Sequence, residues 1–107
     1  MVSAKLSINR SDDAEGIVLV LAGELDLATA PALEQSLNEI ISSGNGRILL
    51  DLNDLSFVDS AGVTVLIRAK RDAEERGRPL VLRRPTEQLH SVFAVVGLAD
   101  WLASGDA

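Results

Sequence analysis

Between two apolar runs, where a strand gives way to a helix, the chain reads Asp51-Leu52-Asn53-Asp54-Leu55-Ser56-Phe57-Val58-Asp59-Ser60-Ala61-Gly62. We interpret this stretch as a strand, a loop and a helix that begins at Ser60. The first turn of a helix leaves backbone N–H groups without partners, and a serine hydroxyl there caps them while it stays accessible to solvent. The same N–H groups and the positive end of the helix dipole also favour a phosphate. We therefore expect Ser60 to be a helix N-cap that accepts a modification without unfolding the chain.

The segments on either side of this stretch alternate between strand and helix patterns. Apolar runs predict strands over residues 4–9, 17–22, 47–52 and 80–82, with a polar turn over residues 10–16. Helical spacing and capping residues predict helices after the N-cap Thr29, from Ser60 to about Arg76, and after Thr86. A strand pair followed by alternating helices and strands is typical of an α/β domain with a mainly parallel sheet. The whole chain, 1–107, is expected to be one domain.

Several acidic residues follow the predicted strands. Crossover connections are right-handed in nearly all α/β proteins, so the second and third strands should point the same way. Their carboxyl ends then share one edge of the sheet, which collects Asp26, Asp54, Asp59 and Ser60. Open α/β sheets bind ligands at such an edge. We therefore expect a binding surface there.

The helix that begins at Ser60 has a distinct core face. At 100° per residue, its core stripe is Gly62, Val65, Leu66, Ala69 and Ala73. Val63 and Ile67 lie on the face of Ser60, and one hypothesis is that they are partly exposed at the centre of a protein-binding patch. The alternative is that a neighbouring helix covers them. Gly62 allows either a close approach by a partner or close packing of the helix on the sheet.

The composition limits the functions that this chain can have. The net charge of −6 disfavours nucleic acid and anionic lipid, and it fits either plain solubility or a positively charged protein partner. The absence of cysteine fits a reducing compartment, and no apolar run is long enough to span a membrane. We therefore expect a cytoplasmic protein that binds neither nucleic acid nor membrane.

Enzyme chemistry is not expected. Ser60 lacks the glycine-flanked elbow and adjacent base of a serine hydrolase, and the single histidine, His90, is expected to face solvent. Asp51 and Asp54 come at a predicted strand end, where acids commonly end a strand, so we expect neither a metal site nor a cofactor. An aspartyl-phosphate receiver is the nearest enzyme-like alternative, but Leu82-Arg83-Arg84 offers arginines where such a domain needs a lysine.

Three motifs in order carry a resemblance to a known family. They are Gly23-Glu24-Leu25-Asp26-x-x-Thr29-Ala30-x-x-Leu33, Phe57-Val58-Asp59-Ser60-Ala61-Gly62, and Gly97-Leu98 before Asp100. Over essentially its whole length, the chain resembles the STAS family, specifically the single-domain anti-sigma factor antagonists of bacteria. The resemblance implies the STAS (SpoIIAA-like) fold, a mixed and mainly parallel sheet of four to five strands packed with three to four helices.

The resemblance also implies a function without catalysis. The unphosphorylated form of such a protein binds an anti-sigma factor, usually a serine kinase with a histidine-kinase-like ATPase fold, and thereby releases a sigma factor. Phosphorylation ends the binding, and a PP2C-type phosphatase restores it. The phosphorylated serine falls on Ser60 and the acidic residue that engages the partner on Asp26; the full expected partner surface is Asp26, Thr29, Asp59, Ser60, Ala61, Gly62, Val63 and Ile67. The alternative is a STAS regulatory subunit of a signalling scaffold or of a lipid-transport (ABC) complex.

Overall fold

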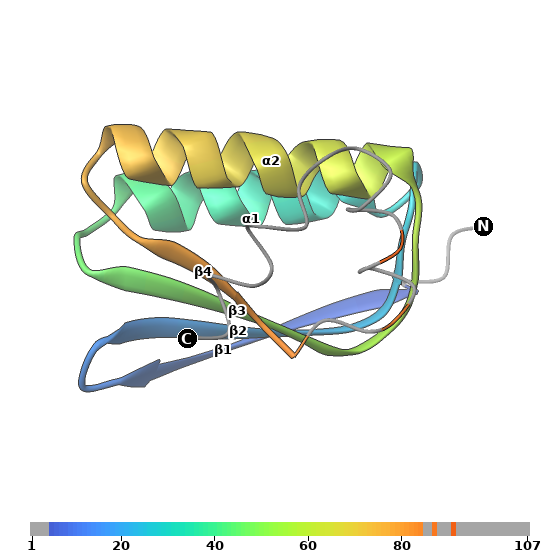
Figure 1. Cartoon of the computed structure of the whole chain (residues 1–107), viewed down its shortest axis with the longest axis horizontal. Helices are drawn as coiled ribbons and strands as arrows, with labels where there is room; N and C mark the ends of the chain where they lie inside the picture. Colours follow the sequence, from blue (N-terminus) through green and yellow to red (C-terminus); the bar gives the residue numbers. More distant parts are fainter. Residues whose placement is uncertain (1–4, 85–86, 88–90, 92–107) are drawn as a thin grey trace.

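A sheet and a pair of helices on one of its faces make up the described part of the computed structural model, which covers residues 5–84, 87 and 91 (Figure 1). The strands are β1 (Leu6–Asp13), β2 (Gly16–Leu25), β3 (Arg47–Val58) and β4 (Leu80–Arg83), and the helices are α1 (Ala30–Ser42) and α2 (Ser60–Glu75). The predicted α/β class is confirmed, and both helices lie close to their predicted bounds. The predicted helix after Thr86 and the Gly97-Leu98 motif lie outside the described residues, apart from Glu87 and Ser91.

The strands lie in the order β1-β2-β3-β4. β1 is antiparallel to β2, whereas β2 is parallel to β3 and β3 is parallel to β4. The prediction that the second and third strands point the same way is therefore confirmed, and α1 and α2 are the crossover helices that parallel pairing requires. In register, Glu24 lies beside Phe57 and Leu25 beside Val58. The carboxyl ends of β2 and β3 thus meet at one edge, and we call residues 24–29 and 56–62 there the rim.

The N-terminal hairpin is longer than predicted. β1 continues through Asp13, into the stretch predicted as a polar turn, and pairs with β2 as far as Gly16. Only Ala14 and Glu15 form the turn. The Asp13 carboxylate closes it by accepting the N–H groups of Glu15 and Gly16 at 2.9 and 3.0 Å. A polar stretch is tolerated as strand here because β1 is an edge strand with water on its open side.

The two central strands also run beyond their predicted ends. β2 continues to Leu25 and β3 to Val58, past two register shifts in their pairing. Such bulges let paired strands continue where the regular alternation of apolar side chains breaks, so the sequence pattern ended the predicted strands too early. Asp54 therefore lies within β3, beside Ala22, and not in a loop at the rim as predicted.

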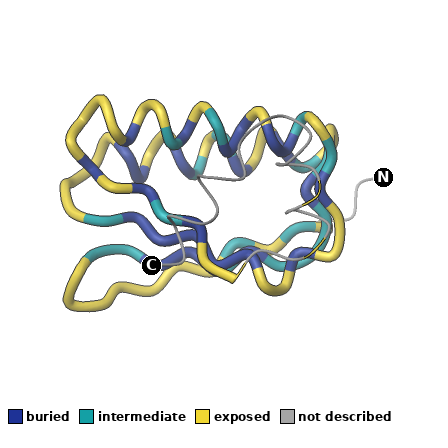
Figure 2. Tube along the Cα trace, viewed as in Figure 1, coloured by how far each residue is buried: buried dark blue, intermediate teal, exposed yellow. Residues whose placement is uncertain are grey.

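The core is aliphatic and lies between the sheet and the two helices (Figure 2). The predicted core stripe of α2 is confirmed, since all of its members are buried: Gly62, Val65, Leu66, Ala69 and Ala73. Each large aliphatic side chain buried in this way contributes about 1.5–3 kcal/mol. Within the described ranges, no helix has the length and apolar character needed to cross a membrane.

A buried arginine closes the C-terminal end of α1. Arg78, just before β4, is 1% exposed. Its Nη1 donates to the carbonyls of Ile40 and Ile41 at 2.6 and 3.1 Å, and its Nε donates to the carbonyl of Gly46 at 2.9 Å. The last carbonyls of a helix lack intrahelical partners and favour a cation. Burial, and to a smaller extent the charge of Arg10, lowers the pKa of Arg78.

Asp51 is a second buried charge and lies in the middle of β3. It forms ion pairs with Arg84 and, at 3.5 Å, with Arg83. Burial by itself raises the pKa of Asp51, but the hydrogen bonds from Arg84 and from the N–H of Asn53, together with the charges of both arginines, outweigh burial and hold the pKa below its ordinary value. The expectation that Asp51 ends a strand is therefore wrong, because this side chain joins β3 to the end of β4.

Candidate functional site

Helix α2 begins with a cap made by Asp59, and the prediction that Ser60 is the cap is wrong. The Asp59 backbone is extended, with φ −111° and ψ −174°, and its Oδ1 accepts the N–H of Gly62 at 3.0 Å. An N-cap side chain bonds to an N–H two or three residues later, and the Asp59 carboxylate already fills that role. The N–H of Asp59 donates to the carbonyl of Leu25 at 3.1 Å, which ties the helix start to the end of β2.

Ser60 is the first residue of α2 and is exposed, as predicted. Its carbonyl accepts the hydroxyl of Thr64 at 2.9 Å, whereas its own hydroxyl bonds to none of the described residues. Backbone N–H groups in the first turn of a helix attract anions. The structure therefore presents this hydroxyl at the surface, at the start of a helix.

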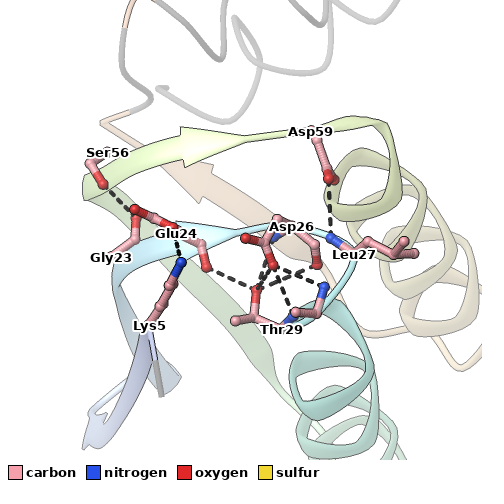
Figure 3. Close-up of polar contacts among 9 residues, drawn as sticks. Lys5, Gly23, Glu24, Asp26, Leu27, Thr29, Ser56 and Asp59 are labelled. Carbon is pink, nitrogen blue, oxygen red and sulfur yellow. Dashed lines mark hydrogen bonds and ion pairs between the residues drawn. The ribbon is translucent and has the colours of Figure 1, made fainter. Parts of the chain in front are cut away.

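Asp26 and Thr29 build the turn that connects β2 to α1 (Figure 3). Asp26 Oδ1 accepts the N–H groups of Ala28 and Thr29 at 2.9 and 3.0 Å. In return, the Thr29 hydroxyl accepts the N–H of Asp26 at 2.9 Å and donates to the carbonyl of Glu24 at 2.8 Å. Thr29 stands at the predicted N-cap position of α1, but its side chain makes no capping bond to the helix and holds the preceding turn instead.

The Asp59 carboxylate joins the two halves of the rim. While Oδ1 caps α2, Oδ2 accepts the N–H of Leu27 at 3.1 Å, across 32 positions of the sequence (Figure 3). One side chain thus fixes the start of α2 relative to the turn between β2 and α1. We call the hydrogen bond from Leu27 to Asp59 the Asp59 strap.

Gly62 allows α2 to lie directly against the end of β2. A Cβ at this position would lie 2.6 Å from Cγ of Leu25 and 3.1 Å from its backbone oxygen. Gly62 is also buried. Of the two roles considered for this glycine, the geometry favours close packing of the helix on the sheet over a close approach by a partner.

The predicted apolar patch on α2 is wrong for Val63, which is 4% exposed and belongs to the core. Val63 lies three positions before Leu66 on the same helix, so it borders the core stripe and its side chain packs with that stripe. Ile67 and Ala61 are half-buried and pack against the core from its edge. The alternative hypothesis, that these side chains are covered, thus holds fully for Val63 and partly for Ile67.

Sequence analysis missed two exposed hydrophobic side chains at the rim. Leu27 is 77% exposed and Phe57 is 41% exposed. Leu27 could have been noticed in the sequence because it lies between Asp26 and Thr29, in a turn. There it belongs to neither the helical nor the strand pattern of buried residues.

The rim carries negative charge beside these apolar groups. Its carboxylates are Glu24, Asp26 and Asp59, and Glu24 forms an ion pair with Lys5 at 3.8 Å. In the part of the chain that the structure describes, no cluster of three acidic or histidine side chains is placed to hold a metal ion. The rim therefore presents an exposed hydroxyl, apolar area and negative charge.

Curated bacterial proteins are similar to this chain. The chain is 34% identical over 89 residues to the anti-sigma-B factor antagonist of Listeria monocytogenes, covering 82% of this chain and 77% of that protein. It is 27% identical over 95 residues to the anti-sigma-B factor antagonist of Bacillus subtilis, covering 89% of this chain and 86% of that protein.

Solved structures and a family model agree with these similarities. The anti-sigma factor antagonist SpoIIAA in its unphosphorylated form superposes with a TM-score of 0.77 at 27% identity, covering 89% of this chain and 84% of that chain. The Bacillus cell fate determinant SpoIIAA in the phosphorylated form gives a TM-score of 0.72 at 27% identity, covering 89% of this chain and 87% of that chain. The family model described as "Mlab, STAS domain" matches residues 8–104. The chain therefore belongs to the STAS domain family.

Proposed function

We propose that this chain is an anti-sigma factor antagonist, which binds an anti-sigma factor through the rim while Ser60 is unmodified and releases it when Ser60 is phosphorylated. The observation that carries the proposal is the exposed hydroxyl of Ser60, at the first residue of α2 and without a hydrogen bond to the described residues. The names of the Listeria and Bacillus relatives and the solved phosphorylated form of SpoIIAA support it.

The charge of a phosphate explains how the modification ends binding. A phosphoserine carries about −1.5 to −2 charges at neutral pH. At Ser60 this charge would join the carboxylates of Asp26 and Asp59 on the rim. In an interface that fits the unmodified hydroxyl, the added bulk and the unpaired charge cost several kcal/mol. A loss of about 2.8 kcal/mol already weakens binding about 100-fold.

The partner in this proposal is an anti-sigma factor of the serine-kinase type, with a histidine-kinase-like ATPase fold, and a PP2C-type phosphatase removes the phosphate. The chain itself catalyses no reaction and acts in the cytoplasm. Gly62 and Val63 are buried, so they would support the contact surface without touching the partner. Ile67 is half-buried and would lie at the edge of the contact surface. The residues proposed to form the surface itself are Asp26, Thr29, Asp59, Ser60 and Ala61.

Mass spectrometry tests the proposed modification. The purified chain is incubated with ATP and, one at a time, with each purified anti-sigma factor kinase encoded in the same genome. We expect one kinase to add a single phosphate to the peptide that contains Ser60 and none to the Ser60→Ala variant. Ser56→Ala is the matched control, because Ser56 is a nearby exposed serine whose hydroxyl donates to the carbonyl of Gly23 at 3.0 Å. Phosphate on another residue, or none with any kinase, would contradict the proposal.

The alternative function as a subunit of a lipid-transport complex predicts a different partner. Affinity capture with the full chain would then recover an ABC-transporter ATPase, and Ser60→Asp would leave that association unchanged. Such a result would contradict the proposed function, whereas recovery of an anti-sigma factor kinase that Ser60→Asp releases would support it.

A further inference from the structure

In the described part of the chain, the large hydrophobic side chains that remain exposed are both at the rim. They are Leu27, at 77%, and Phe57, at 41%. Leu27 comes from the turn after β2 and Phe57 from the end of β3, and the pairing of Phe57 with Glu24 brings these segments side by side. An exposed leucine forgoes the stabilisation that burial gives.

Hydrogen bonds fix the backbone at Leu27 and at the two residues that follow it. Its N–H donates to Asp59 Oδ2 at 3.1 Å. The next two N–H groups, of Ala28 and Thr29, donate to Asp26 Oδ1 at 2.9 and 3.0 Å. Three consecutive N–H groups are thus engaged, and the leucine side chain points away from the network that fixes it (Figure 3). A side chain presented in this way loses little conformational freedom on binding.

We infer that Leu27 is the apolar anchor of the surface through which this chain binds its partner, and that the Asp59 strap holds the anchor in place. The inference rests on the proposed function, because the partner is the anti-sigma factor. Two carboxylates lie beside the anchor, since Asp59 accepts the N–H of Leu27 and Asp26 accepts the N–H groups of the next two residues. The matching surface on the anti-sigma factor is an apolar socket edged by lysine or arginine, since interface cores are apolar and charged rims are complementary.

Asp59 acts in this interface as a positioning residue. Its Oδ1 accepts the N–H of Gly62 and its Oδ2 accepts the N–H of Leu27, so both oxygens are engaged inside the chain. Because Ser60 is the next residue, the same side chain fixes the distance between the anchor and the hydroxyl that is phosphorylated.

Isothermal titration measures the contribution of the anchor. The full-length variants are titrated with the kinase that phosphorylates Ser60, in a non-hydrolysable ATP analogue that keeps Ser60 unmodified. Leu27→Ala should weaken binding at least tenfold without lowering Tm, because its side chain is exposed. The control Val81→Ala, which truncates a half-buried valine paired with Leu49 away from the rim, should stay within twofold of the wild type. Binding of Leu27→Ala within twofold of the wild type would overturn the inference.

The strap has a test that needs no partner. Asp59→Asn keeps one acceptor oxygen for the N–H of Gly62, since asparagine is a good N-cap, but offers no second oxygen to Leu27. Amide hydrogen exchange followed by NMR should become at least tenfold faster at Leu27 and change less at Gly62. If the amide of Leu27 exchanged at the same rate in Asp59→Asn as in the wild type, the Asp59 strap would not hold Leu27 in place.

A double-mutant cycle links the strap to the anchor. If Asp59 acts through Leu27, the loss of affinity caused by Leu27→Ala should be at least threefold smaller in the Asp59→Asn background than in the wild type. Strictly additive losses would contradict a positioning role.

The titrations distinguish a missing anchor from a missing partner. Wild-type binding to the kinase together with equal binding by Leu27→Ala would overturn the anchor alone. Absence of wild-type binding to every kinase tested would overturn both.

Discussion

Asp26 lies on the rim and also stabilises the turn between β2 and α1. Its Oδ1 accepts two backbone N–H groups, those of Ala28 and Thr29. Asp26→Ala removes this acceptor, but water can reach the N–H of Ala28 and the N–H of Thr29 keeps the backbone oxygen of residue 26, so we expect the free energy of unfolding to fall by about 0.5–1.5 kcal/mol. Asp26→Asn retains an acceptor and should cost less. Urea denaturation of the three proteins checks this expectation. Equal stability of Asp26→Ala and the wild type would show that the Asp26 carboxylate does not stabilise the turn.

Gly62 offers a second prediction that depends on one side-chain atom. Gly62→Ala would place a Cβ 2.6 Å from Cγ of the fully buried Leu25. Overpacking of this kind costs about 1–3 kcal/mol of stability. Gly44→Ala is the matched control, because a Cβ there meets nothing within 4 Å. Denaturation midpoints should fall for Gly62→Ala and stay or rise for Gly44→Ala, and the reverse order would show that α2 does not pack on β2 as described.

Helix α1 depends at its C-terminal end on a residue that lies outside it. The Arg78 guanidinium donates to the carbonyls of Ile40 and Ile41 in the last turn. Arg78→Met keeps much of the buried volume but removes charged hydrogen bonds that are worth about 1.5–3 kcal/mol each, so we expect a clear loss of stability. Arg76→Met changes an exposed arginine two positions earlier and should alter stability by less than about 0.5 kcal/mol. Thermal unfolding of the two variants tests this role of Arg78. Equal Tm values for Arg78→Met and Arg76→Met would show that Arg78 does not stabilise the end of α1.

The link between β3 and β4 predicts a dependence of stability on pH. Ion pairs with Arg84 and Arg83 hold the pKa of Asp51 below its ordinary value despite burial. A lowered pKa in the folded state stabilises the fold above the unfolded value of about 3.9, and this contribution is lost as the pH falls through the folded value.

Urea midpoints at pH 7 and at pH 3 test this dependence. Asp51→Asn should lower the midpoint relative to the wild type at pH 7, and the difference between the two proteins should shrink on acidification. Asp72→Asn, at an exposed position on α2, is the control and should change the midpoint little at either pH. A difference for Asp51→Asn that stayed constant from pH 7 to pH 3 would contradict the ion-pair explanation.

Across the whole molecule, some features of the fold could be predicted from the sequence and others could not. Local patterns were sufficient for the α/β class, the parallel pairing of β2 with β3, and the core stripe of α2, because burial against a sheet imposes a regular period. Periodicity could not locate the ends of β2 and β3, where bulges break the alternation. It also misplaced Val63, which lies at the border between the two faces of α2 and is buried by the rest of the core.

The candidate site was predictable in its position but not in its internal bonding. Parallel strands bring Asp26, Asp59 and Ser60 to one edge, as expected from topology alone. The cap of α2 is a local bond from the N–H of Gly62 to Asp59, but aspartate and serine are both good capping residues, so the pattern alone does not choose between Asp59 and Ser60. The bond from the N–H of Leu27 to Asp59 spans 32 positions, and no local pattern encodes it.

In the proposed function, phosphate on Ser60 ends the association of this chain with an anti-sigma factor. The most direct measurement compares the affinity of the purified kinase for the unmodified chain with its affinity for the chain phosphorylated at Ser60, with Ser60→Ala as a control that cannot be modified. We expect the phosphorylated chain to bind at least about 100-fold more weakly, and Ser60→Ala to bind like the unmodified chain. Equal affinities for the phosphorylated and unmodified chains would contradict the claim.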